Sequence, residues 1–174
     1  MAYRSRVQAA AIASSTITTK KDWGPHLWKI FHSIAERIGN QPIEMLAADE
    51  LREFVHMLSL VDKIMPCSLC ATHFREWCSK HPIRGFSNLR GTSLKGAARK
   101  WFFELHEEVN KRNEVVTAIT IEVLPDIYKQ TNIREEWNTF LTKIKANAQM
   151  GMISQKDLAE FSRHLGSLRK LIGA

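Results

Sequence analysis

Apolar residues recur at intervals of three and four along most of the chain after residue 22, which is the spacing of one face of an α-helix. The first such stretch places Leu27, Phe31, Ile34 and Ile38 at these intervals, and Gly39 follows as a C-terminal cap. The same periodicity predicts six helices, over residues 25–38, 46–65, 67–81, 93–113, 133–149 and 154–171.

The segments between these helices contain the residues that interrupt helices. Pro66 and Pro82 end the second and third helices, and Ser154 is the expected N-cap of the last one. Residues 83–92 are expected to form a loop, and the β-prone run 115–123 an extended connector or a short turn of helix. The absence of strand–helix alternation argues against a Rossmann or thioredoxin-like sheet, and the sequence predicts an all-α bundle.

Composition and charge narrow the class of protein. The 174 residues suffice for one core, and 44% hydrophobic with 25% charged residues match a globular chain rather than a disordered or fibrous one. The net charge of +7 suits an anionic partner, but the basic residues are spread over every predicted helix. No stretch approaches the roughly 18 apolar residues of a membrane span. We therefore expect neither a nucleic-acid nor a membrane partner.

The chain is expected to divide into a flexible basic tail over residues 1–22, a main domain over 23–125 and a helical extension over 126–174. The extension carries no chemical motif, so it is expected to pack on the core or on a partner. The tail holds four basic residues and no acidic residue before Asp22, a composition that also fits a mitochondrial presequence. Without a secretory signal, the cytoplasm is the expected location, and the mitochondrion is the alternative.

Three cysteines are too few for a disulfide scaffold, so they indicate redox or metal chemistry. Cys67 and Cys70 form a C-x-x-C pair after a proline at a helix start, where unpaired backbone N–H groups favour a thiolate and the two sulfurs can reach disulfide distance. A zinc site is the alternative, because Cys78 and His81 complete a C-x2-C-x7-C-x2-H pattern. No glycine bends the chain between the ligand pairs, so redox chemistry is favoured.

The zinc alternative describes a helical nucleic-acid- or protein-binding module stapled by Cys67, Cys70, Cys78 and His81. Inert buried thiols in a purely structural interaction protein are a third alternative.

Three segments within residues 23–113 carry a more specific pattern. They are Trp23-Gly24-Pro25-x-x-Trp28-x-x-x-His32, Met65-Pro66-Cys67-Ser68-Leu69-Cys70-Ala71-Thr72-His73-Phe74, and Trp101-x-x-x-Leu105-His106-Glu107-x-Val109-Asn110. In order and spacing they resemble the Erv/ALR family of FAD-linked sulfhydryl oxidases. The W-G-P opening and the C-terminal extension are most similar to versions carried by large DNA viruses, which would place the protein in the host cytoplasm or the virion.

The resemblance implies a four-helix bundle that binds FAD, with C-x-x-C at the start of its third helix. The implied enzyme is a thiol oxidase that takes electrons from protein dithiols, through the Cys67–Cys70 disulfide and FAD, to O2, giving H2O2. Cys67 would be attacked by the substrate thiolate, Cys70 would pass electrons to the flavin, and His73 would lie near enough to tune that thiolate. The family also implies a homodimer formed through the first helices.

By the same resemblance, ten residues are expected to bind or adjoin the cofactor: Gly24, Trp28, His32, His73, Trp101, His106, Val109, Asn110, Lys111 and Arg112. Trp28 and His32 are four apart and share a helix face, as do His106 and Asn110. Trp101 and His106 are five apart, about 140° around the helix, so both could flank an adenine only if it lay across the helix. Lys111 or Arg112 would meet the pyrophosphate.

The chain also departs from the family pattern. Pro25 and Glu107 stand where many members carry Arg and Asn, so contacts to the cofactor at those two places are in doubt. No cysteine follows Cys78, so it is expected to be free, intermolecular or a helper thiol. No second shuttle pair is present, so electrons would come directly from a substrate protein or through a separate carrier.

Overall fold

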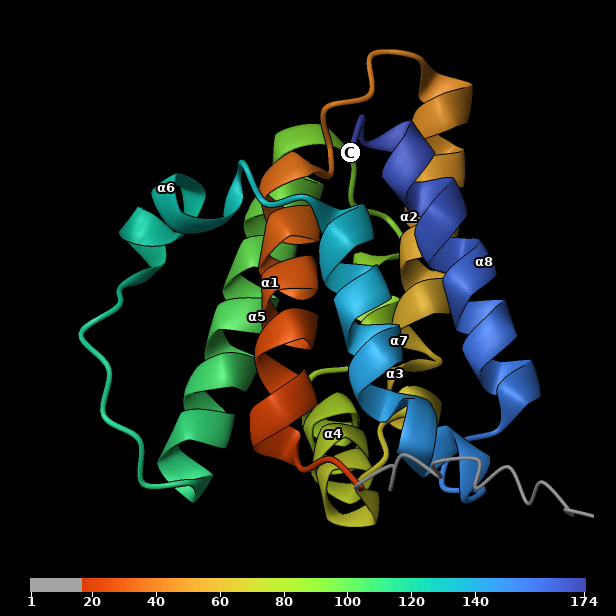
Figure 1. Cartoon of the computed structure of the whole chain (residues 1–174). Helices are drawn as coiled ribbons and strands as arrows, with labels where there is room; N and C mark the ends of the chain where they lie inside the picture. The colour runs from red at the N-terminus through yellow and green to blue at the C-terminus, as the bar shows by residue number, and fades with distance from the viewer. Residues whose placement is uncertain (1–16) are drawn as a thin grey trace, which may run out of the picture.

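A computed structural model describes residues 17–174, and within them it contains α-helices and short 3-10 helices but no strand (Figure 1). This confirms the predicted all-α fold. Most of the predicted tail, residues 1–16, lies outside the described residues. The helices are α1 Lys20–Arg37, α2 Glu44–Leu58, α3 Val61–Ile64, α4 Ser68–Lys80, η1 Ile83–Phe86, α5 Gly91–Arg112, η2 Ile121–Val123, α6 Leu124–Tyr128, α7 Ile133–Gln149 and α8 Gln155–Leu171.

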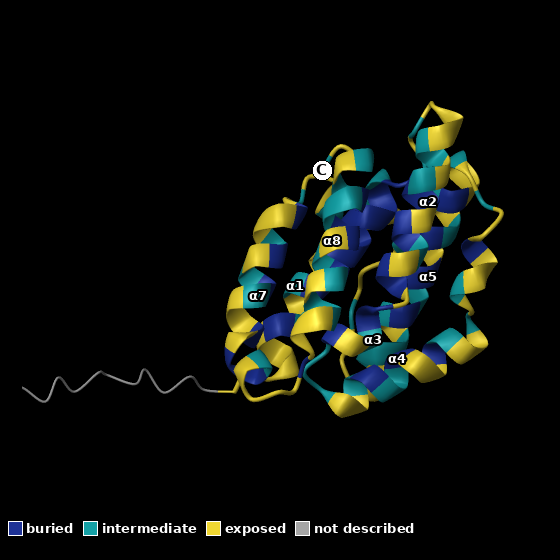
Figure 2. Ribbon diagram, turned by 90° about the vertical axis from the view of Figure 1, so that its right-hand side faces the viewer, coloured by how far each residue is buried: buried dark blue, intermediate teal, exposed yellow. Residues whose placement is uncertain are grey.

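Helix α1 occupies the middle of the molecule, with α5 on one side and α7 on the other, while α8 packs along α2 (Figure 1). Helix α4 lies at one end of this assembly, below α1 and α5 in that view. The buried positions of α2, α7 and α8 face the interior (Figure 2). Five fully buried phenylalanines, one from each of α1, α2, α5, α7 and α8, belong to one hydrophobic core: Phe31, Phe54, Phe102, Phe140 and Phe161. The predicted C-terminal helices therefore pack on the core.

Helix α1 begins at Lys20, more than a turn before the predicted start at Pro25. The Asp22 carboxylate accepts hydrogen bonds from the Thr19 backbone N–H at 2.8 Å and from the Thr19 hydroxyl at 2.9 Å. These bonds cap the helix at Thr19. Pro25 consequently lies inside the helix rather than in its first turn, and its missing N–H falls on an exposed part of the helix.

The predicted second helix, 46–65, is two helices, because α2 ends at Leu58 and α3 begins at Val61. The Ser59 hydroxyl donates to the His56 carbonyl at 2.7 Å, and the Leu60 N–H turns to the Met57 carbonyl at 3.1 Å. These local bonds replace the regular ladder and break the helix.

Other boundaries agree more closely with the sequence. Ser154 caps α8 as predicted, by accepting from the Asp157 N–H at 3.3 Å. The run 115–123 is an irregular connector that ends in the single turn η2, and no strand forms there. Helix α6 was not predicted. No helix within residues 17–174 has the length and apolarity that crossing a membrane requires.

Two contacts fix α1 against α5. The Arg99 guanidinium donates to both carboxylate oxygens of Glu36, at 2.7 and 2.5 Å, and Glu36 is buried. Such bidentate pairs define orientation as well as distance. Beyond the end of α1, the backbone of Gly39 passes close to Gly91 at the start of α5. The two helices that carry the first and third sequence motifs are therefore held in one register.

Candidate functional site

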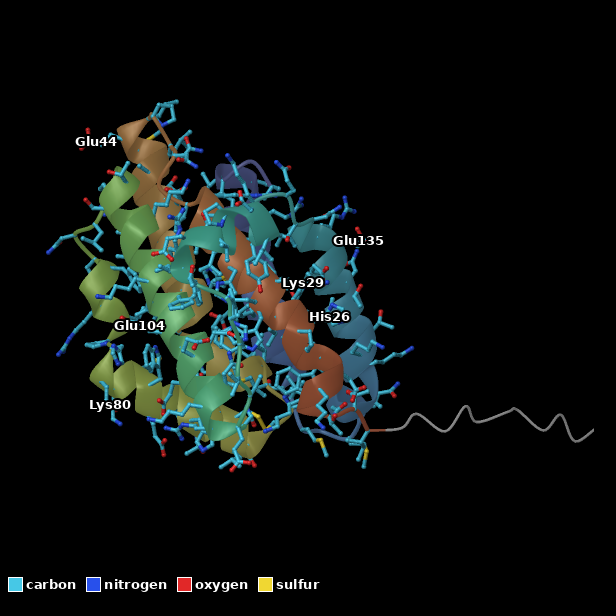
Figure 3. All side chains as sticks on the ribbon, turned by 90° about the vertical axis from the view of Figure 1, so that its left-hand side faces the viewer. His26, Lys29, Glu44, Lys80, Glu104 and Glu135 are labelled. Atoms are coloured by element: carbon cyan, nitrogen blue, oxygen red, sulfur yellow. A yellow bond between two sulfur atoms is a disulfide. The ribbon has the colours of Figure 1, made fainter. Side chains whose placement is uncertain are left out.

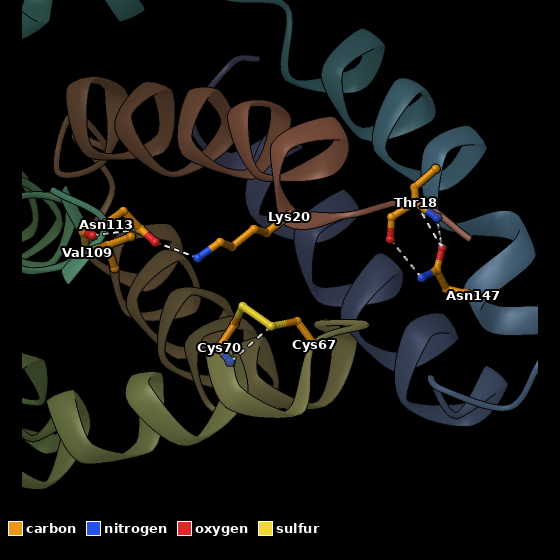
Figure 4. Close-up of a disulfide and its surroundings, with 7 residues drawn as sticks. All are labelled: Thr18, Lys20, Cys67, Cys70, Val109, Asn113 and Asn147. Carbon is orange, nitrogen blue, oxygen red and sulfur yellow. Dashed lines mark hydrogen bonds between the residues drawn. A yellow bond between two sulfur atoms is a disulfide. The ribbon is translucent and has the colours of Figure 1, made fainter. Parts of the chain in front are cut away.

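The C-x-x-C pair lies at the N-terminal end of α4, where Cys67 is the N-cap and Cys70 is in the first turn. The two sulfurs form a disulfide, and Cys67 Sγ also accepts a hydrogen bond from the Cys70 N–H at 3.2 Å (Figure 4). An N-cap sulfur lies at the positive end of the helix dipole. Reduction would therefore leave the Cys67 sulfur in a place that stabilises a thiolate.

The surroundings of this disulfide come from the beginning of α1 and the end of α5 (Figure 4). Lys20 Nζ donates to Asn113 Oδ1 at 2.5 Å, and Asn113 Nδ2 donates to the Val109 carbonyl at 2.7 Å. Leu69, between the two cysteines, is 61% exposed. The pair is thus packed against the bundle on one side and open to a partner on the other. Lys20 and Asn113 were missed by the sequence analysis, because neither belongs to a motif.

Away from the disulfide, α1 and α5 form an aromatic stack. The Trp28 and His106 rings lie 3.9 Å apart and are nearly parallel, at 8°. His32 Nε2 lies 3.0 Å from His106 Nδ1. The Tyr128 ring also stacks on His32, at 4.6 Å and 19°. The fold therefore brings together three of the predicted cofactor residues and adds one from α6.

Tyr128 could not be found from the sequence, because its approach to His32 depends on how α6 packs. The Arg37 guanidinium donates to the carbonyls of Lys129, at 2.7 and 3.0 Å, and of Thr131, at 2.9 Å. These bonds attach the chain just after α6 to the C-terminal end of α1. The only signal in the sequence is an isolated tyrosine after a proline, which has no specific meaning.

The two histidines of the stack are uncharged at neutral pH. Burial lowers the pKa of His32 to about 3, and the nearby His106 adds to this effect. Burial likewise lowers the pKa of His106 to about 4, against a smaller opposing effect of the Glu107 carboxylate. His32 Nδ1 is buried and has no hydrogen-bond partner among residues 17–174. Aromatic rings and a spare ring nitrogen are the groups that bind a flat heterocycle with hydrogen-bonding atoms, but the rings here are stacked on one another, so a heterocycle could enter between them only by separating them.

Trp101 does not join this stack. It is buried among aromatic rings of α4 and η1, including Phe74, Trp77 and Phe86, and its indole N–H donates to the His81 carbonyl at 3.1 Å. On α5 it faces a different direction from His106, as the spacing of five residues requires.

The other predicted residues of α5 lie near its C-terminal end. Asn110 is half-buried and donates to Glu107 at 3.0 Å, while Lys111 is exposed. Arg112 contacts the carboxylates of Glu108 at 2.9 Å and Glu76 at 3.2 Å. The charge of Arg112 is therefore already opposed by two carboxylates, which leaves Lys111 as the cation freer to meet a phosphate.

Gly24 and His73 complete the predicted set. Gly24 lies on α1 next to open space, because a Cβ added to it would meet no atom within 4 Å. His73 is half-buried on α4, one turn after Cys70.

The zinc hypothesis finds no support in this arrangement. Cys67 and Cys70 are joined to each other, and the His81 ring stacks on Trp77 at 3.7 Å. Burial, with a contribution from Asp62, raises the pKa of Cys78 to about 11. Nowhere in the described part of the chain do three or more His, Cys, Asp or Glu side chains gather as a metal site would require.

Known proteins are similar to this chain in sequence. The family model described as Erv1 / Alr family matches residues 25–138, which is more than half of the chain. This chain belongs to the Erv1/Alr family. Over 105 residues it is 31% identical to the FAD-linked sulfhydryl oxidase ERV2 of Saccharomyces cerevisiae, covering 59% of this chain and 47% of the yeast protein.

Two plant relatives are more distant. The FAD-linked sulfhydryl oxidases ERV1 of Oryza sativa and Arabidopsis thaliana are 24% and 23% identical over 93 residues. These matches cover 53% of this chain, and 42% and 43% of the relatives, so the chain spans less than half the length of the curated family members it matches. No solved structure matched this member of the family.

Proposed function

We propose that this chain is an FAD-dependent sulfhydryl oxidase that forms disulfide bonds in substrate proteins. The observation that carries the proposal is the Cys67–Cys70 disulfide at the N-terminus of α4, in a bundle whose α1 and α5 present the Trp28–His106 stack. Membership of the Erv1/Alr family and three relatives named FAD-linked sulfhydryl oxidase support it.

The kinds of residue present suit the cofactor. Trp28, His32, His106 and Tyr128 are flat aromatic side chains, and His32 Nδ1 is a buried polar atom without a partner in the described chain. Because these rings are stacked on one another, FAD would have to part the Trp28–His106 or the His32–Tyr128 contact in order to lie between them. Lys111 would meet the pyrophosphate. When bound, FAD would accept two electrons from the reduced cysteine pair and deliver them to O2, producing H2O2.

The cysteines carry out the exchange with the substrate. A substrate thiolate attacks Cys67 Sγ, the Cys67–Cys70 bond breaks, and Cys70 leaves as a thiolate. The second substrate thiol, after losing its proton, attacks the substrate sulfur of this mixed disulfide, and Cys67 leaves as a thiolate at the N-cap. The substrate is then oxidised to a disulfide, and the C-x-x-C pair is reduced by two electrons. Cys78 is given no role in this exchange, because it lies eight residues beyond Cys70 on α4, about 12 Å along the helix, and because burial raises the pKa of its thiol to about 11.

A homodimer and a cytoplasmic location, with the mitochondrion as the alternative, belong to the same proposal. Helices α7 and α8 cover α1 and α2 on one side, so a second copy would have to approach the first helices through the surface that remains.

The test is Cys70→Ser, measured on purified protein supplied with FAD. We expect dithiol oxidation to be abolished, because a serine at this position cannot form the disulfide. The visible flavin absorption of the protein should be retained, because position 70 lies outside the aromatic stack. Cys78→Ser is the matched control and should keep both activity and flavin. Full dithiol oxidase activity in Cys70→Ser would show that the assignment is wrong.

A further inference from the structure

The acidic residues of this chain are distributed less evenly than the basic ones. Residues 77–103 contain six Lys or Arg and no Asp or Glu. Since the whole chain carries a net charge of +7, the residues outside this segment have a combined net charge of only +1. The segment comprises the C-terminal end of α4, η1 and the first half of α5.

A groove of about 380 Å³ runs through this basic region. Six of the residues that line it define its character: Lys80, Phe86, Leu89, Lys100, Trp101 and Glu104. Phe86 and Trp101 are 3% and 8% exposed and form an apolar floor, while the lysines are exposed at the edge. Figure 3 shows Lys80 and Glu104 at one edge of the molecule, away from His26 and Lys29. We call this feature the basic groove.

The charge around the basic groove is largely uncompensated. Lys100 forms an ion pair with Glu104 at 3.7 Å, and Arg99 forms one with the buried Glu36. Lys80 and Arg84 make no ion pair within residues 17–174. Exposed cations without counter-charges raise the local concentration of an anionic partner and orient its approach.

The walls of the groove favour a protein segment over other polyanions. Single-stranded nucleic acid binds by stacking its bases on accessible aromatic rings, but Phe86 and Trp101 are buried. A membrane surface would be contacted by exposed large apolar side chains, and those that the structure describes all lie outside residues 77–103. Leu89 and Ala97 line the groove and are half-buried, so they leave accessible apolar surface between the lysines for one apolar side chain flanked by carboxylates.

The groove is also within reach of the redox pair. Cys70 and Lys80 are ten residues apart on α4, which is about 15 Å at about 1.5 Å per residue. An extended peptide covers that distance with about five residues, at about 3.3 Å each. The groove lies beside Trp101, on a different face of α5 from the Trp28–His106 stack, so a peptide there leaves the stack free.

We propose that the basic groove docks an acidic segment of the substrate protein, with one apolar anchor, about five or more residues from the cysteine that attacks Cys67. This rests on the proposed function, since it names the class of protein the oxidase would prefer.

The experiment compares two synthetic dithiol peptides, one with an acidic segment around a leucine five residues from its cysteines and one with Gln in place of each Glu. FAD-loaded wild type, Lys80→Glu/Lys100→Glu and the control Lys145→Glu/Lys156→Glu are assayed on both peptides and on dithiothreitol. The control changes the net charge equally at exposed lysines on α7 and α8. Fluorescence anisotropy measures the affinity for a cysteine-free acidic peptide independently of turnover.

We expect wild type and control to oxidise the acidic peptide with kcat/KM about tenfold above the neutral one, because a few exposed ion pairs together contribute an effect of about that size. The groove variant should lose this preference and bind the acidic peptide about tenfold more weakly, with unchanged dithiothreitol oxidation. Equal use of both peptides by wild type would overturn the docking proposal alone.

Two other results would count against the proposed function or against a protein partner. Failure of wild type to oxidise dithiothreitol would refute the proposed function, while the anisotropy result would still decide whether the groove binds acidic peptide. A single-stranded oligonucleotide that bound more tightly than the peptide, and lost affinity in the groove variant, would overturn the choice of a protein partner.

Discussion

Replacing Gly39 by Ala should destabilise the protein where α1 meets α5. Gly39 has a φ of +78°, and a Cβ at this position would overlap the backbone carbonyl of Gly91, with the carbonyl carbon only 2.9 Å away. The neighbour is backbone at the start of α5, not the flexible end of a side chain. The Gly39 N–H also donates to Glu50 at 3.1 Å, so the segment cannot shift without losing that bond.

The magnitude follows from two costs. Holding an L-residue at positive φ costs about 1–2 kcal/mol, and forcing a carbon into a filled space costs about 1–3 kcal/mol. A combined loss of about 3 kcal/mol should lower the Tm of a domain of this size by about 6–12 °C. Because α1 carries Trp28 and His32 and α5 carries His106, the variant should also bind FAD less tightly.

Gly96→Ala is the matched control. Gly96 is exposed inside α5, and a Cβ added there would meet no atom within 4 Å. The same chemical change should there stabilise the helix by about 0.8–1 kcal/mol and raise the Tm by about 2–4 °C. Circular dichroism during thermal and urea unfolding measures both variants. A Tm for Gly39→Ala within about 1 °C of wild type, on the order of the measurement error, would refute the argument from the Gly39–Gly91 contact.

Two further predictions concern buried ionisable side chains. Because the pKa values of His32 and His106 are lowered to about 3 and about 4, the unfolded chain binds protons that the native chain excludes below pH 6.5. Stability should therefore fall as the pH decreases from about 6.5 towards 4, by up to about 1.4 kcal/mol per pH unit for each histidine. Urea unfolding of wild type and His32→Gln/His106→Gln checks this, and equal pH slopes would contradict it. Arg99→Met should cost about 3–5 kcal/mol, because it leaves Glu36 buried without its partner. Glu36→Leu/Arg99→Met should recover most of that loss in the same assay, and a double variant as unstable as the single one would argue against it.

The sequence by itself determined the all-helical class, the long helices and the chemistry of the cysteine pair. Apolar spacing, Pro66 before the pair and the helix-start position of Cys67 are local features, and local features are set by residues a few positions apart. Two helix boundaries differ from those that the apolar periodicity predicts, because local hydrogen bonds decide them. These are the start of α1, which is capped at Thr19, and the break between α2 and α3 at Ser59. The motif residues Trp28, His32 and His106 were found in the sequence because their order and spacing resemble a family.

Only the tertiary structure decided which of these residues meet. Tyr128 stacks on His32 although the two are far apart in the sequence, and Trp101, from the same motif as His106, faces another part of the molecule. The C-terminal helices were recognisable as amphipathic, but their periodicity could not say that α7 would cover α1 and α8 would cover α2. The physical reason is that packing between distant segments depends on the shape of both surfaces at once, and a pattern within one segment describes only its own face.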